Sequence, residues 1–310
     1  MTQVALSAPY SRFEHFAQTG STNDVVRGWL AAGVDEVCVA AADEQAAGRG
    51  RQGRTWTAPA GAALLMSLGF RPAWLPADRV WRLGATMALA MADAAEEVAG
   101  LPTGAVRLKW PNDLVVETSG PNALLMGIED AAVAAALLRG PVTLRKLAGV
   151  LGESDGLGTD EPRVAVGMGI NADWAAADFP AELATSMTSL REVSAGRPID
   201  RHALLDAFLG HFEMRFEALK TGYFDIATWT RRQATTGRLV RLEGYGPGAG
   251  PGTEAAELYA FGVDGATGAL LVVDPGSDAE PRPVHAGEVV RVRLAPQSAA
   301  NAAANAAAGV

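Results

Sequence analysis

The segment Gly48-Arg49-Gly50-Arg51-Gln52-Gly53-Arg54-Thr55-Trp56 constrains the fold and the function more than any other stretch of the chain. Alternating glycines let a backbone approach a ligand closely, and the three arginines offer fork-shaped donors to phosphate or carboxylate oxygens. It is not a Walker A loop, because no Gly-Lys-Ser/Thr follows. On composition alone, a solvated basic loop is the simpler interpretation. Trp56 favours a ligand-binding loop, because an aromatic ring can close over a planar or apolar ligand, but a plain core anchor fits equally well.

Predicted strands lie on both sides of this loop. The run 36–42 precedes it and the run 63–70 follows it, so the loop over 45–61 joins two strands. Earlier in the chain, Ser21 offers an N-cap for a helix that Gly33 ends. Hydrophobic patterns predict the remaining elements of this part, which are helices over 79–99 and 201–220 and strands over 13–19, 106–110, 147–151 and 163–170.

The pattern of hydrophobic and turn-forming residues changes after about Gly237. Short strands separated by Gly, Pro and Asp turns are predicted over 239–243, 257–263, 270–273 and 289–294. We therefore expect an α+β domain over 1–235, a small all-β domain over 236–295, and a disordered Ala-rich tail over 296–310.

Composition excludes several classes of protein. With 310 residues, 49% of them hydrophobic, the chain can bury a sizeable core. A formal net charge of -9 argues against DNA binding, since phosphate contacts require clustered Lys and Arg. Cys38 is the only cysteine and cannot form an internal disulfide. No apolar run of about 18 residues is present to span a membrane. A cytoplasmic enzyme is the default expectation.

A second cluster of polar residues follows the strand predicted over 106–110. Lys109-Trp110-Pro111-Asn112-Asp113 places a cation, a rigid turn, an amide and a carboxylate within five residues. As a set they can bind a metal-nucleotide, with Asp113 near Mg²⁺ and with Asn112 and Lys109 near phosphate or base. Alternatively, the charges at the end of this strand simply face solvent.

Two features surround the strands predicted over 147–151 and 163–170. Lys146 precedes an apolar strand, where its flexible cation can reach a neighbouring pocket, or can guard a strand edge against aggregation. Gly167-x-Gly169-x-x-Ala172 matches the dinucleotide-binding pattern. That match is rejected, because the pattern requires a helix to begin at once and Pro180 leaves too little room for one.

Taken together, the motifs resemble those of the biotin protein ligase family, in order, from Ser21 to about Arg293. The matching segments are Ser21-Thr22-Asn23, Gln45 with the loop from Gly48 to Trp56, Lys109 to Asp113, Lys146-Leu147-Ala148-Gly149, and Gly167 to Asn171. The resemblance implies a class II synthetase-like catalytic domain, with a mixed sheet flanked by helices, followed by a small SH3-like β domain.

The resemblance also assigns site residues. It implies a biotin site formed by Ser21, Thr22, Asn23, Gln45, Gly48, Arg49, Arg51, Trp56, Lys146 and Gly149. It implies an ATP site formed by Arg49, Arg51, Arg54, Trp56, Lys109, Asn112, Lys146 and Asn171. Lys146, Arg51 and Asp113 are the expected catalytic residues, and Asp113 is the expected Mg²⁺ ligand.

The chain departs from the family in one place and lacks one family domain. The connection over 115–144 is far longer than the short hairpin of the family, and we expect a surface excursion there that is helical over 131–138. Only 20 residues precede Ser21, too few for the winged helix-turn-helix of members that repress transcription.

The predicted function is therefore that of a biotin protein ligase. ATP and Mg²⁺ would serve to activate biotin as biotinyl-5′-AMP, and the acyl group would pass to a lysine of a biotin carboxyl carrier protein, of an acyl-CoA carboxylase or of pyruvate carboxylase. We expect a monomer or weak homodimer that binds neither DNA nor membrane. The alternatives are a lipoate or octanoyl ligase of the same fold and a non-catalytic regulator that senses biotinyl-adenylate.

Overall fold

A mixed seven-stranded sheet forms the larger part of the computed structural model, which describes residues 9–246, 255–289 and 291–295. The tail predicted over 296–310 lies outside the described residues. The strand order is β1-β2-β3-β7-β6-β5-β4, and all neighbours are antiparallel except β1 and β2. The strands are β1 (Arg12–Phe16), β2 (Cys38–Ala42), β3 (Ala63–Phe70), β4 (Val106–Lys109), β5 (Asp113–Ser119), β6 (Thr143–Asp155) and β7 (Arg163–Asn171).

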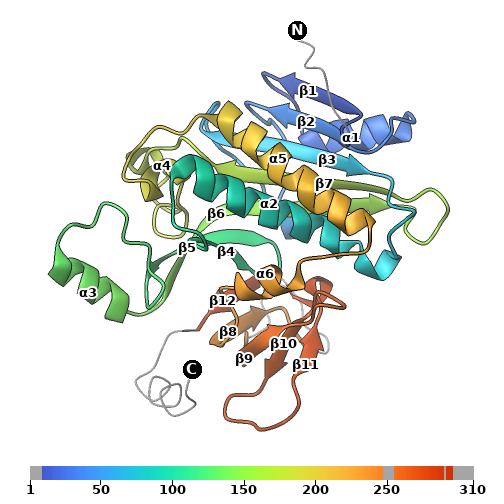
Figure 1. Cartoon of the computed structure of the whole chain (residues 1–310). Helices are drawn as coiled ribbons and strands as arrows, with labels where there is room; N and C mark the ends of the chain where they lie inside the picture. Colours follow the sequence, from blue (N-terminus) through green and yellow to red (C-terminus); the bar gives the residue numbers. More distant parts are fainter. Residues whose placement is uncertain (1–8, 247–254, 290, 296–310) are drawn as a thin grey trace.

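Helices cover both faces of this sheet (Figure 1). Helices α2 (Trp81–Ala99) and α5 (Arg201–Lys220) pack on one face, and α1 (Thr22–Ala31) packs on the other. The alternation along β7 follows from this, because Val164 and Val166 join the core beneath α2 while Ala165 joins the cluster beneath α1. Residues on the α1 face of β6 and β7 are therefore the ones that can reach the loop after β2.

The aromatic side chains of α5 fill the core between this helix and the sheet. Phe208, Phe212 and Phe216 are fully buried at one-turn spacing, and Phe216 lies 5.6 Å from Phe70 of β3, ring centre to ring centre. The packing of these three rings therefore holds α5 against the sheet.

A second sheet of five antiparallel strands follows, in the order β11-β10-β9-β8-β12. Its strands are β8 (Arg238–Glu243), β9 (Ala256–Val263), β10 (Leu270–Val273), β11 (Arg282–Val284) and β12 (Arg291–Leu294), and the short helix α6 (Ile226–Arg231) leads into it. The α+β class, with a mixed sheet and a small β unit, is thus confirmed. Within the described ranges, no helix has the length and apolar character needed to cross a membrane.

Buried ion pairs position the second sheet against the first. Arg232, which follows α6, donates to Glu96 of α2 at 2.6 Å. The buried carboxylate of Glu117 on β5 accepts from Arg107 at 3.3 Å and from Arg238 of β8 at 2.7 Å. Because each carboxylate is desolvated, it requires these partners, and the contacts fix how the two sheets meet.

The long connection after β5 is only partly a surface excursion. Residues 115–119 continue β5 and 143–144 begin β6, so the excursion covers 120–142 rather than 115–144. Its helix α3 (Ala131–Arg139) confirms the prediction over 131–138 and has no buried residue. Leu124 and Met126, in contrast, pack against the main core, so the start of the excursion belongs to the domain.

Some predicted boundaries were wrong, and some elements were not predicted. β1 ends at Phe16 rather than at residue 19, while β11, α6 and the four-residue helix α4 (Leu190–Val193) were not expected. Ser21 occupies the N-cap position of α1, but its side chain makes no capping bond. The amide of Thr22 donates instead to Gln45 at 2.7 Å, so a residue distant in sequence satisfies the helix terminus.

Phe212→Ala should destabilise the protein by about 3–5 kcal/mol, because it opens a cavity in the aromatic row. Met214→Ala on the same helix is the matched control, since Met214 is 65% exposed, and its effect should stay within about 0.5 kcal/mol. Urea unfolding of the two variants measures the difference, and equal midpoints would contradict the packing described.

Candidate functional site

One cavity collects most of the side chains that the sequence motifs single out. It lies on the α1 face of the sheet, below the loop that joins β2 to β3. The predicted site residues that line it are Ser21, Thr22, Asn23, Gln45, Arg49, Arg51, Arg54, Trp56, Lys109, Asn112, Asp113, Lys146 and Gly149. All five sequence motifs therefore contribute residues to a single concave surface. Two of the predicted site residues, Gly48 and Asn171, do not line it.

The floor of the cavity is made of glycines. A Cβ added at Gly169 of β7 would lie 2.6 Å from the Trp56 ring, and one at Gly149 of β6 would lie 3.4 Å from it. Glycine is required there because the indole lies directly on the backbone. The indole Nε1 is buried without a hydrogen-bond partner among the described residues. Trp56 is thus a cavity residue and not an anchor in the hydrophobic core.

Three charges meet at the end of the cavity nearest β4 and β5. The Lys146 ammonium lies 2.6 Å from Asp113 Oδ1, and the Lys109 ammonium lies 3.7 Å from Asp113 Oδ2. Burial lowers the pKa of Lys109 below its ordinary value, and the nearby charge of Lys146 acts in the same direction. A carboxylate shared by two ammoniums leaves a local excess of positive charge, which suits a phosphate group.

A β-bulge places Lys146 in this cluster. The register between β5 and β6 shifts between Leu114 and Val115, so that Val115 pairs with Lys146 although Leu114 pairs with Ala148. The extra residue turns Lys146 to the side of Gly149, whose added Cβ would lie 3.0 Å from the ammonium. The long connection over 120–142 therefore does not alter the position of Lys146 beside Asp113.

The segment from Gly48 to Trp56, here called the Gly-Arg loop, is folded tightly on itself. Gly50 donates to the Arg54 carbonyl at 2.7 Å, and Trp56 donates to the Gly48 carbonyl at 2.9 Å. A Cβ at Gly48 would lie 2.4 Å from the Trp56 carbonyl oxygen, so Gly48 permits this closure without lining the cavity. Gln52 adopts the left-handed conformation at φ 57°, at the tip of the loop.

Arg51 connects the loop to the segment 286–289 between β11 and β12. Its guanidinium donates to Asn112 Oδ1 at 3.3 Å and to the carbonyl oxygens of Ala286 and Val289 at 2.5 and 3.4 Å. Burial lowers the pKa of Arg51, and the negative charge of Asp113 opposes that shift. These partners are neutral, so the charge of Arg51 remains available to an anion.

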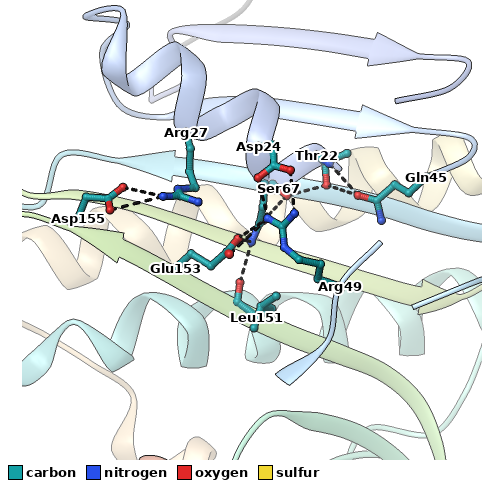
Figure 2. Close-up of polar contacts among 10 residues, drawn as sticks. Thr22, Asp24, Arg27, Gln45, Arg49, Ser67, Leu151, Glu153 and Asp155 are labelled. Carbon is teal, nitrogen blue, oxygen red and sulfur yellow. Dashed lines mark hydrogen bonds and ion pairs between the residues drawn. The ribbon is translucent and has the colours of Figure 1, made fainter. Parts of the chain in front are cut away.

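Arg49 has partners of the opposite kind (Figure 2). It donates to both carboxylate oxygens of Asp24 at 2.7 Å and to Glu153 at 3.0 Å. The hydrogen bond to Asp24 raises the pKa of Arg49 and lowers that of Asp24.

A chain of polar contacts runs beneath the end of the cavity formed by α1. The amide and the hydroxyl of Thr22 lie 2.7 and 3.0 Å from Gln45 Oε1. Ser67 Oγ of β3 lies 2.7 Å from Thr22 Oγ1 and 2.6 Å from Asn23 Oδ1. Asn23 Nδ2 donates to Glu153 at 2.7 Å.

Sequence reasoning missed Ser67, Glu153 and Arg291. A serine within the apolar run 63–70 and a glutamate within an apolar strand were signals for the first two. No local signal marked Arg291, which reaches the cavity from β12 of the second sheet.

Asn171 lies beneath the site instead of lining it. Its side chain is fully buried and donates from Nδ2 to the Thr188 carbonyl at 2.9 Å. Thr188 donates in turn to the Lys146 carbonyl at 2.8 Å, so Asn171 braces the segment beside Lys146. The structure thus does not bring Asn171 into the cavity with the other residues of the predicted ATP site, and its contact with ATP stays a prediction.

The cavity is lined by many basic residues and by several apolar ones. Its basic residues are Arg49, Arg51, Arg54, Lys109, Lys146 and Arg291, and Asp113 is the only acid among the described residues that line it. Apolar contacts come from Met66, Met168, Leu183 and Met187. Such a cavity can hold a molecule with an apolar part and a polyanionic part.

Comparison with known proteins gives consistent findings. Residues 15–171 match the biotin/lipoate A/B protein ligase family. The chain is 30% identical over 242 residues to a biotin–[acetyl-CoA-carboxylase] ligase of Mycobacterium tuberculosis, covering 77% of each chain. It is 31% identical to the ligase of that name from Paracoccus denitrificans, covering 84% of this chain and 93% of that one. Biotin protein ligase from Aquifex aeolicus, solved with biotin and ATP, has the same fold, with a TM-score of 0.67 and 21% identity over 92% of this chain and 99% of that one.

Gly169→Ala should displace the Trp56 ring, because the new methyl group would overlap it. With 5-fluorotryptophan incorporated and the Trp56 signal assigned by Trp56→Phe, ¹⁹F NMR should show that signal shifted. Gly152→Ala is the control, since a Cβ there meets nothing within 4 Å. An unshifted Trp56 signal in Gly169→Ala would contradict the placement of the indole.

Proposed function

This chain belongs to the biotin/lipoate A/B protein ligase family, and on that premise we propose that it is an ATP-dependent biotin protein ligase. It activates biotin as biotinyl-5′-AMP and transfers the biotinyl group to a lysine of a carrier protein. The observation that carries this assignment is the meeting of Lys146, Lys109 and Asp113 at the cationic end of a cavity whose other end is lined by Ser21, Thr22 and Gln45.

The first half-reaction forms a mixed anhydride. A carboxylate oxygen of biotin attacks the α-phosphorus of ATP in line, the bond to the bridging oxygen breaks, and pyrophosphate leaves. Because all four side chains line the cavity, we assign Lys146 and Lys109 to the α-phosphate, whose negative charge increases during the attack, and Arg51 and Arg54 to the departing pyrophosphate. The ion pairs with Asp113 position both ammoniums before ATP binds, so little reorganisation is needed during the reaction.

The second half-reaction transfers the acyl group. The neutral amine of a carrier lysine attacks the acyl carbon, the bond to the AMP oxygen breaks, and one proton is released. Between the two steps the anhydride must be shielded from water. The Gly-Arg loop, with Trp56 on the glycine floor, is placed to provide this shield.

The biotin ring system is assigned to the opposite end of the cavity. Its ureido group would bond with Ser21, Thr22, Asn23 and Gln45, and its apolar rings would pack against the Trp56 indole that covers Gly149. Residues 1–235 would supply this catalytic unit, while the second sheet would contribute Arg291 and the carbonyl oxygens that hold Arg51.

Magnesium is the expected companion of ATP. No group of three or more His, Cys, Asp or Glu side chains that could hold a metal is found in the described ranges. The ion would be bound mainly by nucleotide phosphates and water, with Asp113, which lines the cavity, as its protein carboxylate. When bound, the ion would neutralise phosphate charge.

The partner is inferred from the related ligases. Their names specify acetyl-CoA carboxylase, so a biotin carboxyl carrier protein is the proposed acceptor, and the carrier domain of pyruvate carboxylase is a second candidate. We propose that the enzyme acts in the cytoplasm, as a monomer or weak homodimer.

One assay separates this function from its alternatives. Purified protein should catalyse pyrophosphate–ATP exchange that depends on biotin and stops with EDTA, and it should then label a carrier domain. Exchange that depends on lipoate or octanoate instead would make the protein a lipoate-type ligase. Binding of biotinyl-adenylate without exchange would identify a regulator.

Lys146→Met should reduce biotin-dependent exchange by about two to three powers of ten, because it removes one charged contact to the reacting phosphate. The methionine side chain retains the packing against Trp56, so the thermal unfolding temperature should change little. Exchange at the wild-type rate would remove Lys146 from the reaction.

Arg51→Ala should release biotinyl-adenylate about ten- to a hundredfold faster, because a charge-assisted contact is lost. Free adenylate acylates exposed lysines, so a bystander protein such as serum albumin should become labelled. The wild-type enzyme with the same mixture is the control. Labelling confined to the carrier domain, at a reduced rate, would show that Arg51 does not retain the intermediate.

A further inference from the structure

We propose that Glu153 is a positioning residue of this ligase, which anchors the Gly-Arg loop through Arg49 and orients the polar chain that receives biotin through Asn23. The inference rests on the proposed function. Glu153 lies on β6 and does not itself line the cavity, and it gives Arg49 a different task from that of Arg51.

The carboxylate of Glu153 lies where three elements meet. Glu153 is on the α1 face of β6, with its side chain 25% exposed. It accepts from Asn23 at the start of α1 at 2.7 Å. It also accepts from Arg49 at the start of the loop at 3.0 Å (Figure 2). A single side chain therefore connects the sheet, the helix and the loop.

Arg49 is held as an anchor by this arrangement. Asp24 binds it with two parallel hydrogen bonds, and Glu153 binds it from β6. Two carboxylates around one guanidinium leave a net negative charge, which would repel a phosphate from this position. Arg51, whose partners are carbonyl and amide oxygens, has no such obstacle. We therefore assign loop anchoring to Arg49 and phosphate binding to Arg51.

Glu153 also determines which way the Asn23 amide points. A carboxylate can only accept, so the Asn23 NH₂ group must face Glu153, and its Oδ1 must face Ser67. A Cβ at Gly167 would lie 2.3 Å from Asn23 Oδ1, so the amide is confined from that side as well.

The orientation of Asn23 passes to the residues above it. Ser67 and Thr22 have one hydroxyl hydrogen each, but three close contacts link Asn23 Oδ1, Ser67 Oγ, Thr22 Oγ1 and Gln45 Oε1. The hydroxyl hydrogen of Ser67 is shared by Asn23 Oδ1 and Thr22 Oγ1, and Thr22 donates its own hydroxyl hydrogen to Gln45 Oε1. Thr22 Oγ1 then keeps one lone pair for a ligand, which suits an N–H group of a ureido ring.

The chain supplies a matched control for Glu153. Asp155 lies two residues further along β6 on the same face, and it pairs with Arg27 of α1 at 3.2 Å. This pair also links α1 to β6 (Figure 2), yet the bonds it makes reach neither the loop nor Asn23. Loss of an ordinary strand-to-helix ion pair should therefore affect Asp155→Asn and Glu153→Gln equally, whereas loss of positioning should affect Glu153→Gln alone.

The first measurement is the kinetics of biotin-dependent pyrophosphate exchange. Glu153→Gln should raise the KM for biotin about tenfold or more, since hydrogen bonds to a charged group are lost. Its KM for ATP should rise less than its KM for biotin, because Arg51 keeps its own contacts with Asn112, Ala286 and Val289, and Asp155→Asn should resemble the wild type throughout. Equal biotin KM values for Glu153→Gln and Asp155→Asn would overturn the proposal. So would a parallel rise of the KM values for biotin and ATP accompanied by a lower unfolding temperature, which indicates a structural role only.

The second measurement needs no activity. Trypsin cleaves after arginine, so the rate of cleavage within 49–54 reports how often the loop leaves its anchor. Cleavage should be several-fold faster in Glu153→Gln than in Asp155→Asn, and equal rates would overturn the anchoring role. If the wild-type protein shows no biotin-dependent exchange, the proposed function fails. If it does and the two variants behave alike, only this inference fails.

Discussion

The antiparallel pairing of β5 with β6 is the constraint on which the site depends. This pairing brings the Asp113 carboxylate within 2.6 Å of the Lys146 ammonium across a connection of more than twenty residues, 120–142. Closing a longer loop costs little additional free energy, because the entropic term grows only with the logarithm of loop length. Hydrogen bonds of the strand pair and the bulge at Val115 set the geometry instead. The excursion can therefore vary while the reacting charges stay in place.

A division of tasks among chemically similar side chains follows from their surroundings. Arg49 faces carboxylates, Arg51 faces neutral carbonyl and amide oxygens, and Lys146 shares one carboxylate with Lys109. A guanidinium group thus serves as a structural anchor when carboxylates surround it, as at Arg49. It can bind an anion when its partners are neutral, as at Arg51. The glycine floor adds a steric condition, since only backbone lies beneath Trp56.

Sequence reasoning reached most of the fold because the relevant signals were local. The runs 36–42 and 63–70, the α5 periodicity and the alternating strands after Gly237 each follow from hydrophobic pattern and turn residues. β11 was missed because it is only three residues long and contains Pro283. Glu153 was missed because a charged residue in a strand most often faces solvent, and Arg291 because its sequence neighbours say nothing of the cavity.

By itself, the sequence determined the α+β class, the order of the motifs and the chemical types that the site would contain, because each depends on residues that are close together along the chain. The tertiary structure decided which of those residues meet. Asn171 and Gly48 belong to motifs but support the site from outside it. Three contacts decided by the tertiary structure are those of Asn23 with Glu153, of Arg49 with Asp24 and of Arg51 with Val289. They join residues between roughly 25 and 240 positions apart. Hydrogen bonds between packed elements specify such contacts, and a local sequence pattern does not.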